Sequence, residues 1–465
     1  MGILIKNGTV ISASDEFVGD VLIEGEKIKE VGVRLPEAGH SVIDAKGKYV
    51  FPGGVDEHVH MGSFATTTFD TSHAAVAGGT TTIVDFPAQL EGKGIIESVE
   101  IQKKEHAEGK SSADYSFHGM VMDTSEALLD EIPKLTDAGI CSLKFFMAYK
   151  YTPFMVDDDL IFKSMQIAKD HGVTIMVHAE NGNMVYVLQQ QLAAAGKTEP
   201  IYHAASRPPI VEEEAARRAI SFAELSGCPL FIVHVSTKGA ARAIREAKER
   251  GLPVYGETCT HYLTLDESNL AKPNFEGAKY VCSPALRKPE HLEAMWKAIA
   301  ADDLTAVGSD HAAVDGGFEK KKDGLDNFAK IPNGCPSMQA RLAMLWTQGV
   351  ETGKISRQRF VEIFATAPAK VTGLWPQKGV IAPGADADIV IFDPKFRGTI
   401  TFADSLEGTD YCTFEGFEKK GQAEKVFLRG KLAAENGKFV GEKGKGRYIR
   451  PKPYGLCYDG VKKPS

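Results

Sequence analysis

Eight short apolar runs alternate with helical patterns through the middle of the chain, and this feature constrains the fold most. The runs are 55–59, 81–86, 115–120, 142–146, 173–177, 230–233, 254–257 and 304–307. Strands that alternate with helices build parallel sheets through right-handed crossovers. Eight such units predict an α/β fold, a TIM-like (β/α)8 barrel. An open doubly wound sheet is the alternative, but no G-x-G-x-x-G follows the first run, and the count fits barrel closure.

The segments between these runs carry apolar residues at spacings of three and four, with charged residues on the other face. This period is typical of amphipathic helices that pack one face against a sheet. The clearest examples are 95–106, 159–169, 211–225, 238–250 and 289–300. We expect these helices to surround the barrel.

Both ends of the chain are rich in short β-type runs and turn residues. Such runs occur at 3–5, 21–23 and 28–33, and again at 388–392 and 425–430. We predict one small β-sandwich domain built from both termini; two unrelated β pieces are the alternative. The predicted divisions are 1–52 and 376–440 for the two parts of the sandwich, 53–375 for the catalytic barrel and 441–465 for a C-terminal arm.

Composition excludes several functional classes. The chain has 465 residues and a net charge of -8, which disfavours a general polyanion binder, so no nucleic-acid partner is expected. No run approaches the roughly 18 apolar residues of a membrane span, and the N-terminus lacks a signal peptide's apolar core. The 7 cysteines are odd in number and form no C-x-x-C pair. This favours reduced thiols in the cytoplasm that take no part in a metal site.

Polar residues stand at the ends of the predicted barrel strands, where such barrels place their chemistry. In strand order they are His58 with His60, Asp85, His118, Lys144, His178, His234, Glu257 and Asp310. So many polar groups at one barrel mouth are hard to explain as packing, because uncompensated burial is costly. His58 and His60 share one face of a strand, a spacing that suits two imidazoles on one ion. Four imidazoles and one carboxylate exceed the needs of one tetrahedral ion and favour a two-metal site.

Lys144 is unexpected inside the apolar run 142–146, because burial disfavours an ammonium group. Its stem could extend to solvent. Alternatively, the neutral amine could react with CO2 to form a carbamate, an anion able to bridge two metals. The lysine alone leaves the two interpretations about even, and the surrounding ligand set favours the carbamate.

At this point the chain resembles the dihydropyrimidinase/D-hydantoinase family of cyclic amidohydrolases, within the metal-dependent amidohydrolase superfamily. The similarity covers nearly the whole chain. The segments that carry it are FPGGVDEHVH (51–60), GGTTTIVD (78–85), SLKFFMAYK (142–150), VHAEN (177–181), VHVS (233–236), GETC (256–259), SPALR (283–287), GSDH (308–311) and IPNG (331–334). The resemblance implies a metal-dependent barrel, a β-sandwich made from both termini, and an N6-carboxylated lysine bridging two zinc ions.

The resemblance also implies a role for each residue of the site. Bicarbonate or CO2 would carboxylate the lysine, and a hydroxide between two Zn2+ ions would be the nucleophile. Asp310 would act as general base and acid. The implied ligands are His58, His60 and Asp310 for one metal, His178 and His234 for the other, and Lys144 for both.

Four residues match substrate-contacting positions. Tyr149 is similar to the family's phenol that stabilises the oxyanion, and it also contacts substrate. Ser283 and Asn333 match positions whose backbone groups hold the cyclic imide. Phe146, with 61–69 and 151–156, would line the gate for the ring's 5-substituent, and an apolar lining there favours aromatic or alkyl groups.

Departures from the family pattern leave more than one substrate ring possible. Ala285 and Ala312 replace residues common in relatives, and the stretch after Asn333 lacks an acidic residue. The first interpretation is ring opening of a dihydropyrimidine or 5-substituted hydantoin to an N-carbamoyl amino acid.

Two alternatives remain beside the first interpretation. One is hydrolysis of allantoin or dihydroorotate, although no clear arginine stands near the first strand's histidines to take the carboxylate of dihydroorotate. The other is a non-catalytic scaffold, which the intact ligand positions disfavour. A monometallic deaminase has no use for Lys144. The resemblance also suggests that the tail reaches a neighbouring subunit in a homotetramer, with a homodimer as the alternative.

Overall fold

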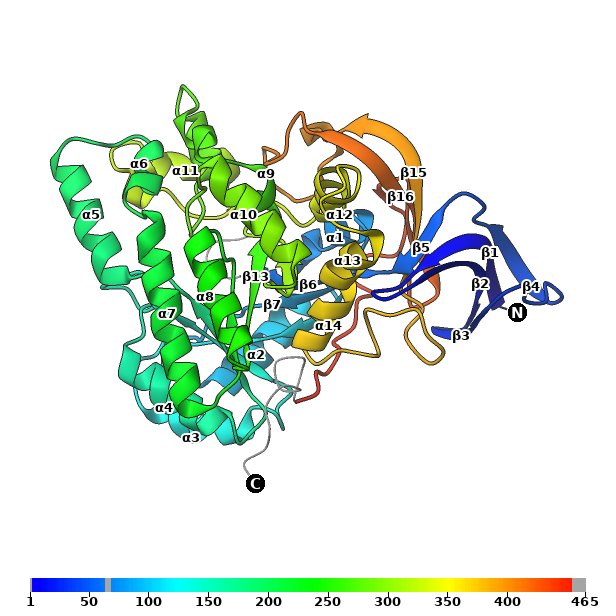
Figure 1. The fold of residues 1–465 in the computed structure, drawn as a ribbon, viewed down its shortest axis with the longest axis horizontal. Coiled ribbons are helices and arrows are strands. Elements are labelled where there is room, and N and C mark those ends of the chain that lie inside the picture. Colours follow the sequence, from blue (N-terminus) through cyan, green and yellow to red (C-terminus); the bar gives the residue numbers. More distant parts are fainter. Residues whose placement is uncertain (1, 63–67, 454–465) are drawn as a thin grey trace.

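The computed structural model describes residues 2–62 and 68–453 (Figure 1). The predicted barrel strands all form, and every pairing between neighbours is parallel. The third predicted strand is divided at His118 into two shorter strands. The strands are β6 (Gly54–Val59), β7 (Thr80–Asp85), β8 (Asp114–Phe117), β9 (Gly119–Met120), β10 (Ser142–Phe146), β11 (Thr174–His178), β12 (Leu230–Ile232), β13 (Val254–Cys259) and β14 (Ala306–Gly308).

Side chains alternate between the two faces of these strands, as the strand period of two requires. On β10, Leu143 and Phe145 join the large apolar cluster beneath the surrounding helices, while Phe146 belongs to a separate interior cluster. On β11, Val177 joins the outer cluster and Met176 the inner one. Lys144 and His178 therefore project toward the barrel interior, because they share the inner register.

The hydrogen-bonded ladder is not one continuous ring. It forms a three-stranded sheet, β6-β7-β8, and a six-stranded sheet from β9 to β14. Between β14 and β6, a single bridge joins Val59 to His311. The buried Arg341 guanidinium spans the same gap, since it donates to the carbonyls of Val307 and Val55 at 2.8 Å each. Side-chain bonds here replace part of the missing backbone ladder.

The five clearest predicted helices are present and begin or end within about two residues of the predicted bounds. Figure 1 shows α7 and α8 lying side by side outside the strands. On α8, Ala240, Ala243, Ile244 and Ala247 are buried, which gives the helix its apolar face. The helices are α2 (Ile95–Ile101, followed by a π-helical segment to Ala107), α4 (Asp158–Ala168), α7 (Pro209–Ser226), α8 (Lys238–Glu249) and α10 (Pro289–Ala300).

Strands from both ends of the chain form one nine-stranded sheet (blue and orange in Figure 1). The two ends meet where β15 pairs antiparallel with β5. A separate apolar cluster, including Val21, Ile23, Ile389 and Phe427, packs within this region. The strands are β1 (Gly2–Ile11), β2 (Glu16–Glu24), β3 (Lys27–Gly32), β4 (His40–Asp44), β5 (Tyr49–Pro52), β15 (Ile389–Thr399), β16 (Glu418–Leu428), β17 (Lys431–Glu435) and β18 (Lys438–Phe439).

The described part of the C-terminal arm lies along β8 of its own chain. Tyr115 donates its backbone N–H to the carbonyl of Arg447 at 2.9 Å and accepts from Ile449 at 2.7 Å. The remainder of the arm, 454–465, lies outside the described residues. Among the described helices, none is both long and apolar enough to cross a bilayer.

Candidate metal centre

The ends of β6 and β14 bring three predicted ligands together. Oδ1 of Asp310 lies 3.3 Å from Nε2 of His58 and 3.4 Å from Nε2 of His60. One ligand atom from each residue falls within 4.8 Å of the others. Burial raises the pKa of the Asp310 carboxyl, but the neighbouring His58 and His60 outweigh it and hold that pKa below its usual value. Asp310 is therefore an anion at neutral pH.

His178 and His234 form the other side of the same centre. Their ring centroids are 4.5 Å apart, and the His234 ring is 5.5 Å from that of His58. All three imidazoles are buried. Nδ1 of His58 contacts Glu257, and Nε2 of His178 lies 2.7 Å from Oε2 of Glu180. A carboxylate on one ring nitrogen fixes the orientation of the ring and leaves the other nitrogen to face a metal.

Lys144 is the central group of the predicted site, and its amine is enclosed. The residue is 1% exposed, so the interpretation in which its stem extends to solvent is wrong. Its Nζ lies 5.1 Å from the ring centroids of both Phe86 and Phe146. Among the described residues no carboxylate oxygen lies within 4.0 Å of it. Burial lowers the pKa of the Lys144 amine to about 8.

The donor atoms fit a divalent metal centre. Nε2 of His58 and Nδ1 of His234 are buried and have no hydrogen-bond partner among the described residues. Native proteins rarely leave buried polar atoms unsatisfied, and imidazole with carboxylate is a donor set that suits zinc and its neighbours. The orphaned nitrogens are accordingly the structural sign that this cluster could hold metal.

Three of the predicted site residues adopt a left-handed backbone conformation, which non-glycine residues rarely do. Their φ values are 69° for Tyr149, 43° for His234 and 47° for Asp310. Such strain persists only where the surrounding structure imposes it, and it clusters at functional sites. It sets these side chains at angles that a regular strand end would not give.

The predicted substrate residues converge beside the metal centre. The Tyr149 ring lies 5.3 Å from that of His178 and 5.8 Å from that of Phe146. The Ser283 hydroxyl lies 3.2 Å from the side-chain oxygen of Asn333. Tyr149 and Asn333 line one small cavity of about 150 Å³. Burial raises the pKa of the Tyr149 phenol to about 12, so this group stays protonated.

The predicted gate is described only in part, because residues 63–67 lie outside the described residues. Met61 and Phe69, at its two ends, are fully buried. The Phe154 ring packs 5.4 Å from Phe146 and 5.6 Å from Tyr149.

Two polar strand-end residues do not join the centre. Asp85 accepts hydrogen bonds from Met61 and Gln102, at 2.7 and 3.2 Å. His118 stacks on Phe86 at 4.2 Å, and both its ring nitrogens are engaged, one of them with the carbonyl of Glu57. These two residues support the loops and strands around the centre.

One cysteine lies close to the proposed metal ligands. The sulfur of Cys259 lies within 4.8 Å of ligand atoms of both His261 and Asp310. Cys259 is therefore a neighbour of the proposed ligands, and the expectation that the cysteines take no part in a metal site stays a prediction. Its spacing of two from Glu257 at the end of β13 places both side chains on one face.

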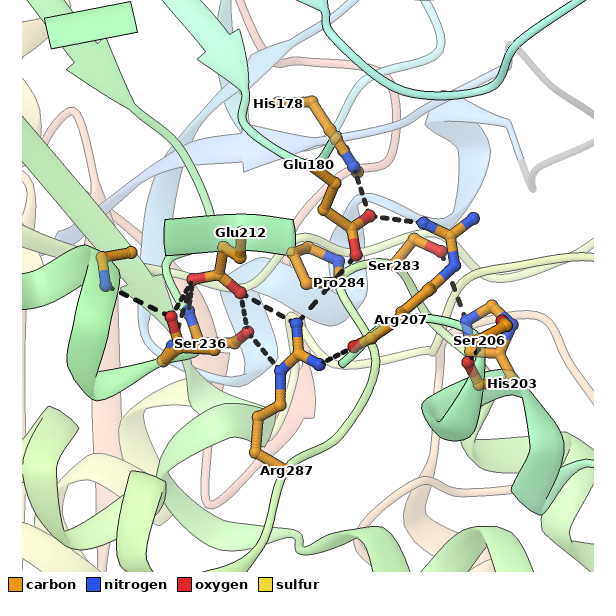
Figure 2. Close-up of polar contacts among 12 residues, drawn as sticks. His178, Glu180, His203, Ser206, Arg207, Glu212, Ser236, Ser283, Pro284 and Arg287 are labelled. Carbon is orange, nitrogen blue, oxygen red and sulfur yellow. Dashed lines mark hydrogen bonds and ion pairs between the residues drawn. The ribbon is translucent and has the colours of Figure 1, made fainter. Parts of the chain in front are cut away.

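A buried charged network beside the centre was not predicted (Figure 2). Glu180 contacts His178 and the guanidinium of Arg207. Arg207 also lies 5.4 Å from the Tyr149 ring centroid, so an arginine does stand near the site, although its charge is paired. Glu180 could have been found, because it follows His178 by two residues. Arg207 lies between α6 (Ile201–Ala205) and α7, where no periodicity marks it.

A second carboxylate of this network is Glu212, at the start of α7. It accepts from the backbone N–H groups of Ser236 and Thr237, at 2.8 and 3.1 Å. It also accepts from Arg287 at 3.0 Å, and Arg287 donates to the backbone carbonyl of Arg207. The network thereby ties the loop that carries Arg207 to the loop after β12 (Figure 2).

A larger cavity, of about 810 Å³, lies elsewhere. Residues of α1 (His73–Ala77), α12 (Arg341–Leu345) and β16 line it, together with the 399–407 segment. It contains none of the predicted site residues, so it is separate from the metal centre.

The chain matches the amidohydrolase family over residues 49–433. It is similar to the D-hydantoinase of Geobacillus stearothermophilus, with 44% identity over 460 residues that cover 97% of this chain and 97% of that protein. It is also similar to the D-phenylhydantoinase of Escherichia coli (strain SE11), with 36% identity over 463 residues covering 98% of this chain and 99% of that protein.

Solved structures give the same result. The dihydropyrimidinase from Brevibacillus agri NCHU1002 is 44% identical, with a TM-score of 0.94 that covers 98% of this chain and 99% of that chain. The L-hydantoinase (dihydropyrimidinase) from Arthrobacter aurescens is 29% identical, with a TM-score of 0.89 over 96% and 99%. The chain therefore belongs to the amidohydrolase family and, within it, to the dihydropyrimidinase/D-hydantoinase family.

Proposed function

We propose that this chain is a hydrolase that opens the ring amide bond of a dihydropyrimidine or a 5-substituted hydantoin and releases an N-carbamoyl amino acid. The observation that carries the proposal is the convergence of two sets of ligand-type side chains on one enclosed lysine. Burial lowers the pKa of His58, His178 and His234, and this lysine lies close enough to lower it further. His58, His60 and Asp310 form one set, and His178 with His234 forms the other. The names of the relatives, which are hydantoinases and a dihydropyrimidinase, support the same chemistry.

Two divalent cations, with Zn2+ the first choice, would be held by these residues. His58, His60 and Asp310 would hold one ion, and His178 and His234 the other. Lys144, carboxylated by CO2 or bicarbonate, would contribute an anion to both. When bound, such ions polarise a carbonyl and lower the pKa of water toward neutrality. The lowered pKa of the Lys144 amine supports the carboxylation, because only a neutral amine reacts with CO2.

The chain's own groups then supply proton transfer and orientation. Asp310 is ionised at neutral pH, so its carboxylate is able to accept the proton of the attacking water and to return it to the leaving ring nitrogen. Tyr149 stays protonated, so its phenol is able to donate a hydrogen bond to the carbonyl oxygen as negative charge develops there.

Ser283 and Asn333 would hold the imide part of the ring opposite the metal centre. Their mutual contact at 3.2 Å and their place beside Tyr149 support this assignment. Phe146, in ring contact with Phe154, would face the ring's 5-substituent. This apolar surface favours aromatic and alkyl groups at that carbon.

The finer features of the fold belong to the same proposal. The eight parallel strands would act as one (β/α)8 barrel over 53–375, with its ladder completed by side chains such as Arg341. The nine-stranded sheet would form the β-sandwich from 1–52 and 376–440, with 441–465 as the arm. We also place the enzyme in the cytoplasm, because six described cysteines are free and buried. A homotetramer, or a homodimer, is the proposed assembly.

A substrate panel tests the proposal. Dihydrouracil, hydantoin, 5-phenylhydantoin, allantoin and dihydroorotate are supplied to the enzyme with zinc and bicarbonate present. We expect turnover of dihydrouracil or the hydantoins, detected as an N-carbamoyl product. Turnover confined to allantoin or dihydroorotate would overturn the proposed substrate class, and no turnover of any ring would overturn the proposed activity.

A further inference from the structure

Three lysines follow one another at 320–322, and only the middle one is buried. Lys321 is 0% exposed, whereas the side chains of Lys320 and Lys322 are 48% and 36% exposed and pair with Asp323 and Glu319. Lys321 ends α11 (Gly317–Lys321) and turns inward. Burying an ammonium group is costly, so its partners explain why it is there.

The partners of Lys321 are backbone carbonyls. Its Nζ donates to the oxygens of Pro332 and Gly334 at 2.9 Å each, and to that of Val281 at 3.3 Å. No carboxylate of the described residues lies within 4.0 Å of this amine. The three oxygens satisfy the three N–H groups of the ammonium, so the full positive charge acts on peptide groups alone.

These carbonyls belong to the two loops that carry the proposed substrate contacts. Pro332 and Gly334 flank Asn333, and Val281 stands two residues before Ser283. The Gly334 N–H also donates to the carbonyl of Val281 at 3.0 Å, which joins the two loops directly. Lys321 thus anchors both the loop that carries Ser283 and the loop that carries Asn333, the two residues that would hold the imide part of the ring.

The peptide group between Pro332 and Asn333 connects Lys321 to the proposed substrate site. In a trans peptide the carbonyl oxygen and the following N–H point in opposite directions. The oxygen of Pro332 faces Lys321, so the N–H of Asn333 points away from it. Within the described residues this N–H has no acceptor, and Asn333 lines the cavity that Tyr149 also lines. A cation on the oxygen polarises the peptide and strengthens the donor at its other end.

We propose that Lys321 is a positioning residue that fixes Ser283 and Asn333 and strengthens the Asn333 N–H as a donor to the ring carbonyl that is not attacked. The inference rests on the proposed function, because it assigns the acceptor to the substrate ring. Lys321 touches neither the substrate nor the metal ligands. Removing the Lys321 amine should therefore weaken binding of the ring and leave the metal centre in place.

The test compares Lys321→Met with Lys322→Met, which removes the exposed neighbour. Each variant is measured with a hydantoin and with its 2-thioxo analogue, as substrate or as competitor, because sulfur is a poorer acceptor than a carbonyl oxygen. For the oxo ring we expect Lys321→Met to raise KM about tenfold, because the Asn333 N–H becomes a weaker and less well positioned donor to the ring, with kcat changed by less than about twofold. For the thioxo ring the affinity should fall by less than about threefold.

Metal content and the melting temperature are measured on the same samples. If affinity falls equally for both rings, or falls in step with metal content, then Lys321 has only a structural role and the proposal is overturned. Unchanged kinetics in Lys321→Met would overturn it as well. If that variant does not fold, Lys321→Gln, a neutral donor, takes its place with the same expected pattern. Lack of turnover in wild type and Lys322→Met alike would instead overturn the proposed function.

Discussion

Two buried polar clusters lie side by side in this molecule, and they differ in how their atoms are satisfied. In the metal centre, Nε2 of His58 and Nδ1 of His234 have no hydrogen-bond partner among the described residues. In the neighbouring Glu212 cluster (Glu212, Ser236, Thr237 and Arg287), both carboxylate oxygens accept hydrogen bonds. His58, His234 and the four residues of the Glu212 cluster are all buried, so solvent does not explain the difference.

The difference indicates that the metal centre needs a ligand from outside the chain, whereas the Glu212 cluster does not. A network whose donors and acceptors are matched rigidifies the fold, whereas unmatched atoms aimed at one point require a ligand. We therefore expect substitutions in the metal centre to remove activity with little loss of stability. Substitutions in the Glu212 cluster should do the reverse.

The largest effect is expected for Lys144→Ala. Loss of the residue proposed to join both ions should lower kcat/KM by about a thousandfold or more, since metal catalysis is worth several kcal/mol. Metal content should fall too, and a short carboxylic acid should restore part of the activity. Lys163→Ala, at an exposed lysine, is the control. Full activity in Lys144→Ala would contradict the proposed role.

Arg287→Met tests the other cluster. Removing one partner of a buried ion pair leaves an uncompensated charge and should cost about 3–5 kcal/mol of unfolding free energy in denaturant titrations. Metal content should stay as in the wild type. The double variant with Glu212→Gln should recover part of the loss, because the orphaned charge is also removed. A stable, metal-free Arg287→Met protein would break the distinction between the two clusters.

Glu180→Gln probes the place where the two clusters meet, because Glu180 contacts His178 and lies 4.0 Å from the guanidinium of Arg287. Loss of a carboxylate that orients a metal-binding imidazole should weaken metal affinity by about 10- to 100-fold, measured by competition with a chelator. Glu213→Gln, at a partly exposed glutamate on the same helix as Glu212, should leave affinity unchanged. Equal metal affinities in the two variants would show that Glu180 does not support the metal centre.

The last expected effect concerns pH. Burial lowers the pKa of the Lys144 amine to about 8, so the neutral fraction rises with pH up to that value and then levels off. At constant dissolved CO2, the rate of reactivation of metal-stripped enzyme should rise about tenfold per pH unit below that point. Arg287→Met should show the same profile. A rate that is flat from pH 6 to 8 would argue against carboxylation.

The sequence predicted the residues whose positions follow from strand register. His58, His60, Lys144, His178, His234 and Asp310 could be placed because strands alternate faces and parallel strands of a barrel end at one mouth. The two chain ends could be joined because both carry the same β-type texture. The order of the barrel strands followed from the alternation itself.

What the sequence did not predict depends on side-chain partners and on irregular backbone. Arg207 reaches Tyr149 from a loop without periodicity, and the burial of Glu212 depends on partners distant in sequence, which are Arg287 and the backbone N–H groups of Ser236 and Thr237. The break in the ladder at His118 and the side-chain closure by Arg341 are likewise tertiary effects. Lys321 looks like one of three surface lysines until the fold places carbonyls around it.

The central claim is that two cations at this barrel mouth open a cyclic amide, and a zinc titration tests it most directly. Metal-free protein is titrated with Zn2+ in the presence of bicarbonate, and hydrolysis of dihydrouracil or 5-phenylhydantoin is followed at each step. We expect activity to rise to a plateau at two equivalents per chain, and Lys144→Ala to gain no activity. A plateau at one equivalent, or turnover that does not depend on metal, would contradict it.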